Sequence, residues 1–128
     1  MEPGTYLVRG VRGATTVERD EPELIHEATR ELLKEMLEAN GIDDFEVIAS
    51  VLFSTTRDLT STFPAEAARA LGMTMVPLMC HAEIDVPDRT PRAIRVLLLF
   101  NTKRSQADIR HIYQREAKAL RPDLVSAQ

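Results

Sequence analysis

Residues 45–54 have the sequence FEVIASVLFS, an almost continuous run of apolar and β-branched side chains. Such a run is typical of a strand buried on both faces, because a strand with one wet face would alternate polar and apolar residues. Residues 93–101, AIRVLLLFN, form a second strongly apolar strand segment. We therefore predict a β-sheet with residues 45–54 at its centre.

A long amphipathic helix of about twenty residues is predicted between Asp20 and Gly41. Asp20 and Glu23 form an Asp-x-x-Glu capping pattern, and Pro22 suits a first helical turn. The apolar positions recur every three to four residues: Leu24, Ile25, Ala28, Leu32, Leu33, Met36 and Leu37. This stripe, ~30 Å long, must cover a sheet face, so we expect Leu32 to serve stability rather than chemistry.

The remaining predicted elements are shorter. Strands are expected at 6–12 and 74–80, and Pro77 places the second at a sheet edge or a bulge. Caps and chain breakers predict a short helix at 64–72, a turn-rich connection at 85–92 and a final helix at 106–117 that Ser105 and Asp108 cap.

This order of elements predicts an α+β fold: a single domain, residues 1–128, with one mixed β-sheet covered on one face by a long helix. The other face of the sheet has no helix to cover it. We therefore expect that face to pack against other subunits.

Composition excludes several classes of protein. The net charge of −4 argues against a surface that depends on phosphate contacts, including a nucleic-acid-binding helix at 105–121. The apolar run VLLLF, 96–100, is far too short to span a membrane, and the N-terminus does not resemble a secretion signal. A single cysteine offers neither an intrachain disulfide nor a metal-binding pair. We expect a cytoplasmic protein without metal, cofactor, membrane or nucleic-acid partner.

Arginine supplies 13 of the 16 basic side chains. Its planar guanidinium matches carboxylates and phosphates, so the bias favours anion recognition. In RGVRG, residues 9–13, Arg9 and Arg12 would point to opposite faces of a strand and cannot form one patch. Gly10 and Gly13 leave room for another backbone or a ligand to approach.

Arg95 places a charge within the apolar run 93–101. A buried guanidinium is costly unless it is paired. Two interpretations stay open at this point. Arg95 forms an internal ion pair with a carboxylate such as Glu83, or it binds an anion from outside the chain.

The segment CHAE, 80–83, carries a thiol, an imidazole and a carboxylate. A lone cysteine in an apolar strand is usually a packing residue, and His81 would point to the opposite side of an extended chain, so covalent catalysis has little support. His26 and His111, expected on helices, have no second metal ligand at the usual spacing. Arginines near strand ends with one carboxylate, one thiol and a phenol such as Tyr113 suit electrostatic catalysis on a small polyanion.

Five segments of the chain resemble, in order, the motifs of the monofunctional α/β-type chorismate mutases, a family distinct from the all-helical chorismate mutases. They are RGVRGATTVERD (9–20), FPAEAAR (63–69), PLMCHAEIDV (77–86), IRVLLLFNT (94–102) and IRHIYQREAKALRPDL (109–124). The resemblance covers nearly the whole chain, and the segments occur with the family's spacing.

The resemblance implies a homotrimer in which three sheets surround a core to form a pseudo-α/β-barrel. Three active sites would lie in clefts between neighbouring subunits. The implied activity is that of an isomerase of aromatic amino acid biosynthesis, in the shikimate pathway, which converts chorismate to prephenate by a concerted [3,3] (Claisen) rearrangement. No covalent intermediate and no cofactor are implied.

The resemblance also assigns roles to individual residues. Arg95 would face the ether oxygen, where negative charge grows in the transition state. Arg12 and Tyr113 would hold the side-chain carboxylate of chorismate, and Glu83 and Cys80 would engage its ring hydroxyl.

Four further residues match positions that bind substrate: Phe63 and Leu120 as apolar walls, Arg69 and Arg121 as cations near the mouth of the site. One position departs from the family, which commonly has lysine where this chain has Glu66. Arg69 would then bind the ring carboxylate alone. The alternatives are a non-catalytic trimeric module that binds small carboxylates and a protein similar to the imine deaminases.

Overall fold

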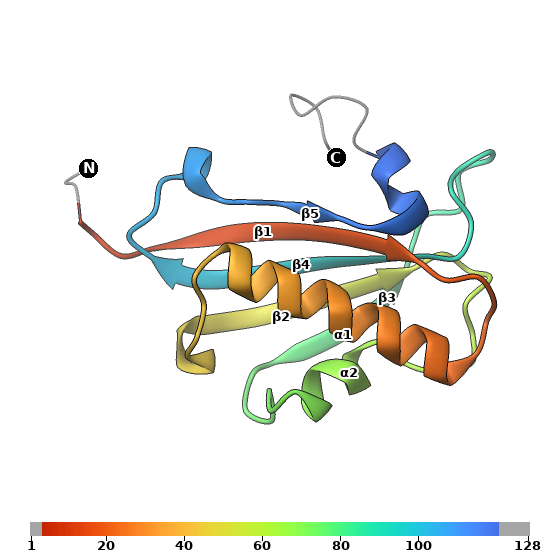
Figure 1. The fold of residues 1–128 in the computed structure, drawn as a ribbon, viewed down its shortest axis with the longest axis horizontal. Coiled ribbons are helices and arrows are strands. Elements are labelled where there is room, and N and C mark those ends of the chain that lie inside the picture. The colour runs from red at the N-terminus through yellow and green to blue at the C-terminus, as the bar shows by residue number, and fades with distance from the viewer. Residues whose placement is uncertain (1–3, 121–128) are drawn as a thin grey trace.

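The computed structural model describes residues 4–120, which build one five-stranded mixed sheet with its helices on one face (Figure 1). The strands are β1 (Leu7–Thr16), β2 (Ile48–Thr55), β3 (Leu78–Ala82), β4 (Ala93–Thr102) and β5 (Ile112–Tyr113), in the spatial order β3-β2-β4-β1-β5. The central strand β4 pairs antiparallel with β1 and β2, whereas the outer pairs β2–β3 and β1–β5 are parallel. The predicted α+β class and mixed sheet are confirmed.

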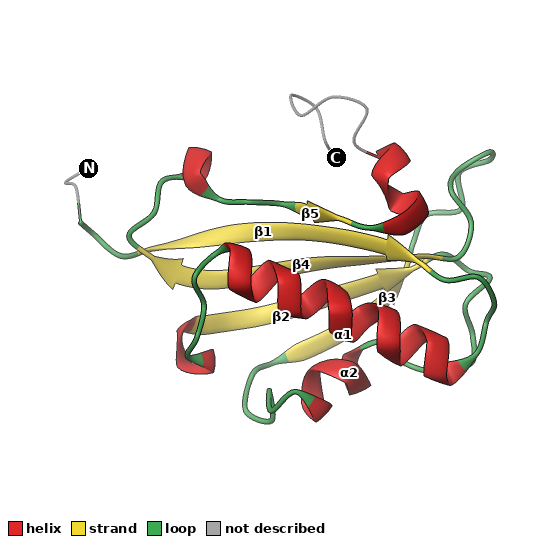
Figure 2. Cartoon of the chain, in the orientation of Figure 1, coloured by secondary structure: helices red, strands yellow, loops and turns green. Residues whose placement is uncertain are grey.

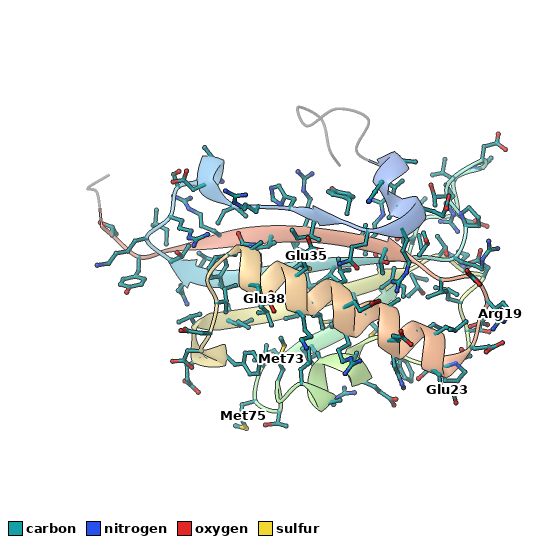
Figure 3. The ribbon with its side chains drawn as sticks, viewed as in Figure 1. Arg19, Glu23, Glu35, Glu38, Met73 and Met75 are labelled. Carbon is teal, nitrogen blue, oxygen red and sulfur yellow. The ribbon has the colours of Figure 1, made fainter. Side chains whose placement is uncertain are left out.

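Two α-helices lie over the same face of the sheet (Figure 2). Helix α1 (Pro22–Ala39) runs across the sheet, and α2 (Ala65–Ala70) lies beside it near β3. The buried face of α1 carries the predicted apolar stripe, with Leu32, Leu33 and Met36 fully buried. The opposite face of α1 is polar, and Figure 3 shows the exposed carboxylates Glu23, Glu35 and Glu38 along the helix. Among the described residues, no helix is long and apolar enough to cross a lipid bilayer.

The close approach of α1 to the sheet depends on Gly13. A Cβ atom at this position would overlap Met36 Sδ and would lie 3.2 Å from Leu32 Cδ1. Both side chains belong to the buried face of α1. The space that Gly13 leaves is therefore filled by the helix, and not by a ligand or another backbone.

The strands differ from their predicted bounds at their ends. β1 extends to Thr16, well beyond the predicted residues 6–12. Residues 45–47 form a 3₁₀ turn whose first backbone groups are capped by Asp44, so β2 begins only at Ile48. β3 begins after Pro77 and lies at the sheet edge, as predicted. Within one chain β2 is buried on its helix-facing side only, since Leu52 on the other side is partly exposed.

The predicted helix cap at Asp20 is wrong. Residue Glu21 occupies the N-cap position and makes no side-chain capping bond. The Asp20 carboxylate instead accepts hydrogen bonds from Thr60 and Ser61. Partial burial alone would raise the pKa of Asp20, but these hydrogen bonds outweigh it and hold the pKa below its ordinary value.

The predicted final helix at 106–117 is also wrong. The chain forms a 3₁₀ turn at Gln106–Asp108, the short strand β5 and a second 3₁₀ segment at Arg115–Leu120 (Figure 2). The hydroxyl of Ser105 bonds the side chain of Asp108 rather than a helical N–H group. His111 is therefore not on a helix but immediately before β5.

The buried Asn40, at the end of α1, explains the extended path before β5. Its Oδ1 accepts from the backbone N–H of Arg110 at 2.9 Å, and its Nδ2 donates to the Arg110 carbonyl at 2.9 Å. These bonds satisfy two Arg110 backbone groups outside a helix. The pairing of β5 with β1 then continues this extended path.

Candidate active site

The sheet face opposite the helices carries the polar side chains predicted for the site. One row of paired residues crosses all five strands in the order Tyr113, Ala14, Arg95, Ser54 and His81. Side chains that share a row of a sheet point to the same face, about 5 Å apart from strand to strand. The next row on this face places Arg12 beside Leu97. The strand register thus brings Arg12, Arg95 and Tyr113 to one surface.

A hollow of about 280 Å³ lies over these rows. It is lined by residues of all five strands, among them Arg12, Leu52, Ser54, His81, Arg95 and Tyr113. Apart from these polar groups, its lining is mainly apolar. A small apolar hollow with a few convergent polar groups is typical of a small-molecule site.

Arg95 forms an ion pair with Glu83, which follows β3 at the sheet edge. The distance from Arg95 Nε to Glu83 Oε2 is 3.3 Å. The side chain of Glu83 is only 14% exposed, while that of Arg95 is 37% exposed. The ion-pair interpretation of Arg95 is therefore confirmed. It does not compete with anion binding, because the guanidinium also lines the hollow.

The position of Glu83 is fixed from two sides. Its backbone N–H donates to the carbonyl of Thr55 at 2.9 Å, and the hydroxyl of Ser54 donates to Oε2 at 3.3 Å. Ser54 lies between Arg95 and His81 in the same row. A carboxylate held in this way limits the positions that the Arg95 guanidinium can take.

Arg12 is held through its backbone. Its N–H group donates to Nδ1 of His111 at 2.9 Å. Partial desolvation, with the nearby Arg12 cation, lowers the pKa of His111 from its ordinary value. The imidazole is thus favoured in its neutral form, which has a nitrogen free to accept this bond.

A family model described as chorismate mutase type I matches residues 8–124. This match covers almost all of the chain, including both arginines of the hollow. The chain belongs to the type I chorismate mutase family.

Individual relatives support the same assignment. Chorismate mutase AroH of Thermus thermophilus is 62% identical over 122 residues, which are 95% of this chain and 100% of that protein. Chorismate mutase AroH of Bacillus subtilis is 43% identical over 119 residues, 92% of this chain and 93% of that protein. The solved structure of a chorismate mutase from Clostridium thermocellum is 45% identical, with a TM-score of 0.85 over 87% of this chain and 98% of that one.

Four of the residues predicted for the site lie together in this family member: Arg12, Arg95 and Tyr113 in the hollow, with Glu83 bound to Arg95. Phe63 lies just before α2, and Arg69 lies on it. Both side chains are exposed, and neither lines the hollow of its own chain. Leu120 ends the 3₁₀ segment that packs on β1. Arg121 lies outside the described residues.

Cys80 requires a correction. It pairs with Phe53 of β2, and its side chain packs with the helix-side core, whereas Arg95 is on the other face. Within this chain its thiol therefore does not reach the hollow. Two bonds, Val51 N–H to the Pro77 carbonyl and Glu83 N–H to the Thr55 carbonyl, show that the odd-numbered residues of this segment bond to β2. The alternating ladder then directs the backbone N–H of Cys80 to the open sheet edge.

Two polar residues of the hollow were missed by the sequence analysis, Ser54 and His81. Both alternate with side chains of the helix-side core along their strands, the buried Phe53 and the partly buried Cys80. The period-two pattern of β2 and β3 separates them from the core-facing side chains, but only the strand order and register place them beside Arg95.

Glu66 is engaged within its own chain. Its Oε2 lies 3.1 Å from His26 Nε2 of α1. Thr62 lies within hydrogen-bond distance of both groups, 3.3 Å from His26 and 3.4 Å from Glu66. The carboxylate of Glu66 is therefore directed toward α1.

Proposed function

We propose that the protein converts chorismate to prephenate as an isomerase of aromatic amino acid biosynthesis. The observation that carries this proposal is the pair Arg12 and Arg95 on one sheet face of a type I chorismate mutase fold, with Arg95 held by Glu83. Chorismate carries two carboxylates, and fixed cations with a buried carboxylate suit it better than they suit a neutral substrate.

The reaction needs no group that becomes covalently attached. In the concerted [3,3] rearrangement the ether C–O bond breaks as a C–C bond forms, so no atom enters or leaves the molecule. Electron density accumulates on the departing ether oxygen in the transition state. We assign the Arg95 guanidinium to that oxygen, because a preorganised cation lowers the barrier selectively where charge develops.

The other residues would hold the substrate in a reactive conformation. We assign Arg12 and Tyr113 to the side-chain carboxylate, which would hold the enolpyruvyl arm over the ring. Glu83 would accept a hydrogen bond from the ring hydroxyl, and the backbone N–H of Cys80, rather than its thiol, would donate one. Glu83 would thus orient both the substrate and Arg95.

We further propose that the working enzyme is a homotrimer with sites between subunits. Val8, Met79 and Leu97 lie exposed on the open sheet face, where apolar surface favours burial by another subunit. Phe63 is 65% exposed and lies away from the hollow of its own chain. We infer that Phe63 and Arg69 of one subunit complete the site of its neighbour, with Leu120 as a second apolar wall and Arg121 as a second cation. The enzyme would act in the cytoplasm.

The test is direct. Purified protein is mixed with chorismate, and the loss of diene absorbance and the appearance of prephenate are followed. Acceleration well above the spontaneous reaction is expected. A rate equal to the spontaneous reaction, in protein with the expected fold, would refute the proposal and favour a binding module.

A further inference from the structure

His111 lies between the two residues assigned to the side-chain carboxylate. Its Nδ1 accepts the backbone N–H of Arg12, and Tyr113 follows two positions later in the chain. The imidazole ring of His111 is not among the groups that line the hollow. Its contact is with the backbone that presents Arg12.

The seam between β1 and β5 is short, so the hydrogen bond between Arg12 and His111 is a large part of the contact across it. Only Gly13 with Ile112 and Ala14 with Tyr113 pair across it. Beyond them, the backbone N–H of Gln114 donates to the Ala14 carbonyl at 2.9 Å. On the other side, the Arg12 N–H donates to the imidazole of His111. The His111 ring therefore extends a two-residue ladder by one bond, at the residue whose guanidinium lines the hollow.

We propose that neutral His111 is a positioning residue that fixes β5 against β1, and so sets Arg12 and Tyr113 for the same substrate carboxylate. This inference rests on the proposed chorismate mutase function. A protonated ring has no free acceptor and would oppose the N–H of Arg12 donor to donor. Loss of this bond leaves a β1 backbone donor unsatisfied and frees the start of β5.

The charges around His111 decide in which direction kcat/KM should change with pH. The Arg12 cation on β1 disfavours protonation of the imidazole. Arg110 and Tyr113 are the titratable residues next to His111 along its own segment, while Leu97 of β4 is the uncharged neighbour of Arg12. A cationic His111 would by charge alone attract a dianionic substrate. A fall in kcat/KM at acid pH therefore reports the lost hydrogen bond and not the gained charge.

The experiment measures kcat and KM for chorismate between about pH 5 and 8, where both carboxylates stay ionised and histidine is the side chain that ordinarily titrates. The wild-type kcat/KM should fall toward acid pH, mainly through a rise in KM. His111→Asn, whose side-chain oxygen can accept the Arg12 N–H without titrating, should keep the neutral-pH activity and lose the acid fall. His111→Ala should lower kcat/KM roughly tenfold at every pH, since it leaves the donor unsatisfied.

The other two histidines serve as controls. His26→Asn, on α1, should leave the acid fall unchanged. His81→Asn should also leave it, because His81 lies on β3, at the sheet edge opposite the β1–β5 pairing. An acid fall that persists in His111→Asn, or disappears in His81→Asn, would overturn the proposal, as would a flat profile of an active wild-type enzyme. Wild-type protein without activity at any pH would instead refute the function itself.

Discussion

At the scale of single residues, the central feature is that one carboxylate holds one guanidinium. Glu83 is more buried than Arg95 and is itself fixed by Ser54 and the Thr55 carbonyl. The internal ion pair and the anion site are therefore one arrangement. A lone arginine in a flexible loop would have to be ordered when substrate binds, whereas this guanidinium is ordered beforehand.

The orientation of Cys80 predicts a small effect for loss of its thiol. Cys80→Ala should change kcat/KM by no more than about threefold, since in the proposed site only the backbone N–H meets the substrate. Glu83→Gln should cost far more, because it removes the charge that orients Arg95. Steady-state kinetics with chorismate check both. A loss in Cys80→Ala as large as that in Glu83→Gln would contradict the assignment to the backbone.

The lowered pKa of His111 also predicts how stability depends on pH. The folded state binds this proton less readily than the unfolded chain, whose histidine titrates near the ordinary value of 6.5. As the pH falls below 6.5, the unfolded chain therefore takes up more protons and the free energy of unfolding decreases. The urea midpoint should drop more between pH 7.5 and 5.5 in wild type than in His111→Asn. Parallel curves for the two proteins would contradict this account.

At the scale of elements, Gly13 sets the distance between α1 and the sheet. Gly13→Ala should lower the free energy of unfolding by about 1–3 kcal/mol, because its methyl group would displace Met36 and press on Leu32. Gly10→Ala is the matched control. A Cβ at Gly10 would meet only the ends of Leu97 and Leu99 at 3.4 Å. Denaturant unfolding compares them, and equal costs would show that Gly13 is not a close-packing position.

The elements that the sequence predicts well are those with strong local patterns. The stripe of α1 repeats over five turns, and β4 is apolar from Ala93 to Phe100 except for Arg95, so both occur close to their predicted bounds. Residues 105–117 have helix-like capping residues, but long-range bonds to Asn40, Arg12 and Ala14 decide their path. Such competition from distant partners leaves no periodic signal in the sequence. The same holds for Asp20, whose partners are forty residues away.

The site shows the same limit. Alternation along β1 predicted that Arg12 and Arg9 face opposite sides, which the structure bears out, because Arg9 donates to the Arg104 carbonyl while Arg12 lines the hollow. Strand order and register cannot be read from alternation alone. Ser54 and His81 could therefore be assigned to the hollow only once β2 and β3 were placed relative to β4.

At the scale of the whole molecule, one chain contains an incomplete site by our account. The hollow is shallow, its apolar surroundings are exposed, and Phe63 with Arg69 lies elsewhere on the chain. Assembly should then be required for activity. Leu97→Asp should yield smaller species than the trimer by light scattering and should lose activity with assembly. A fully active monomer would contradict the shared site.

Mixing subunits tests the sharing of residues between neighbours. Arg95→Ala and Arg69→Ala subunits, each weakly active alone, should regain activity when unfolded and refolded together. Roughly a quarter of the interfaces in a random trimer would combine an intact Arg95 with an intact Arg69. Absence of any recovery, in mixtures shown to contain mixed trimers, would mean that both residues act within one chain.

The most direct test of the central claim is the kcat of Arg95 variants in correctly assembled protein. Arg95→Ala should reduce kcat by at least about 10²–10³-fold, and Arg95→Gln, which keeps hydrogen-bonding capacity without charge, should recover little of it. Those results would show that a fixed positive charge stabilises the developing oxyanion. An Arg95→Ala enzyme with wild-type kcat, or an Arg95→Gln enzyme close to it, would contradict the account.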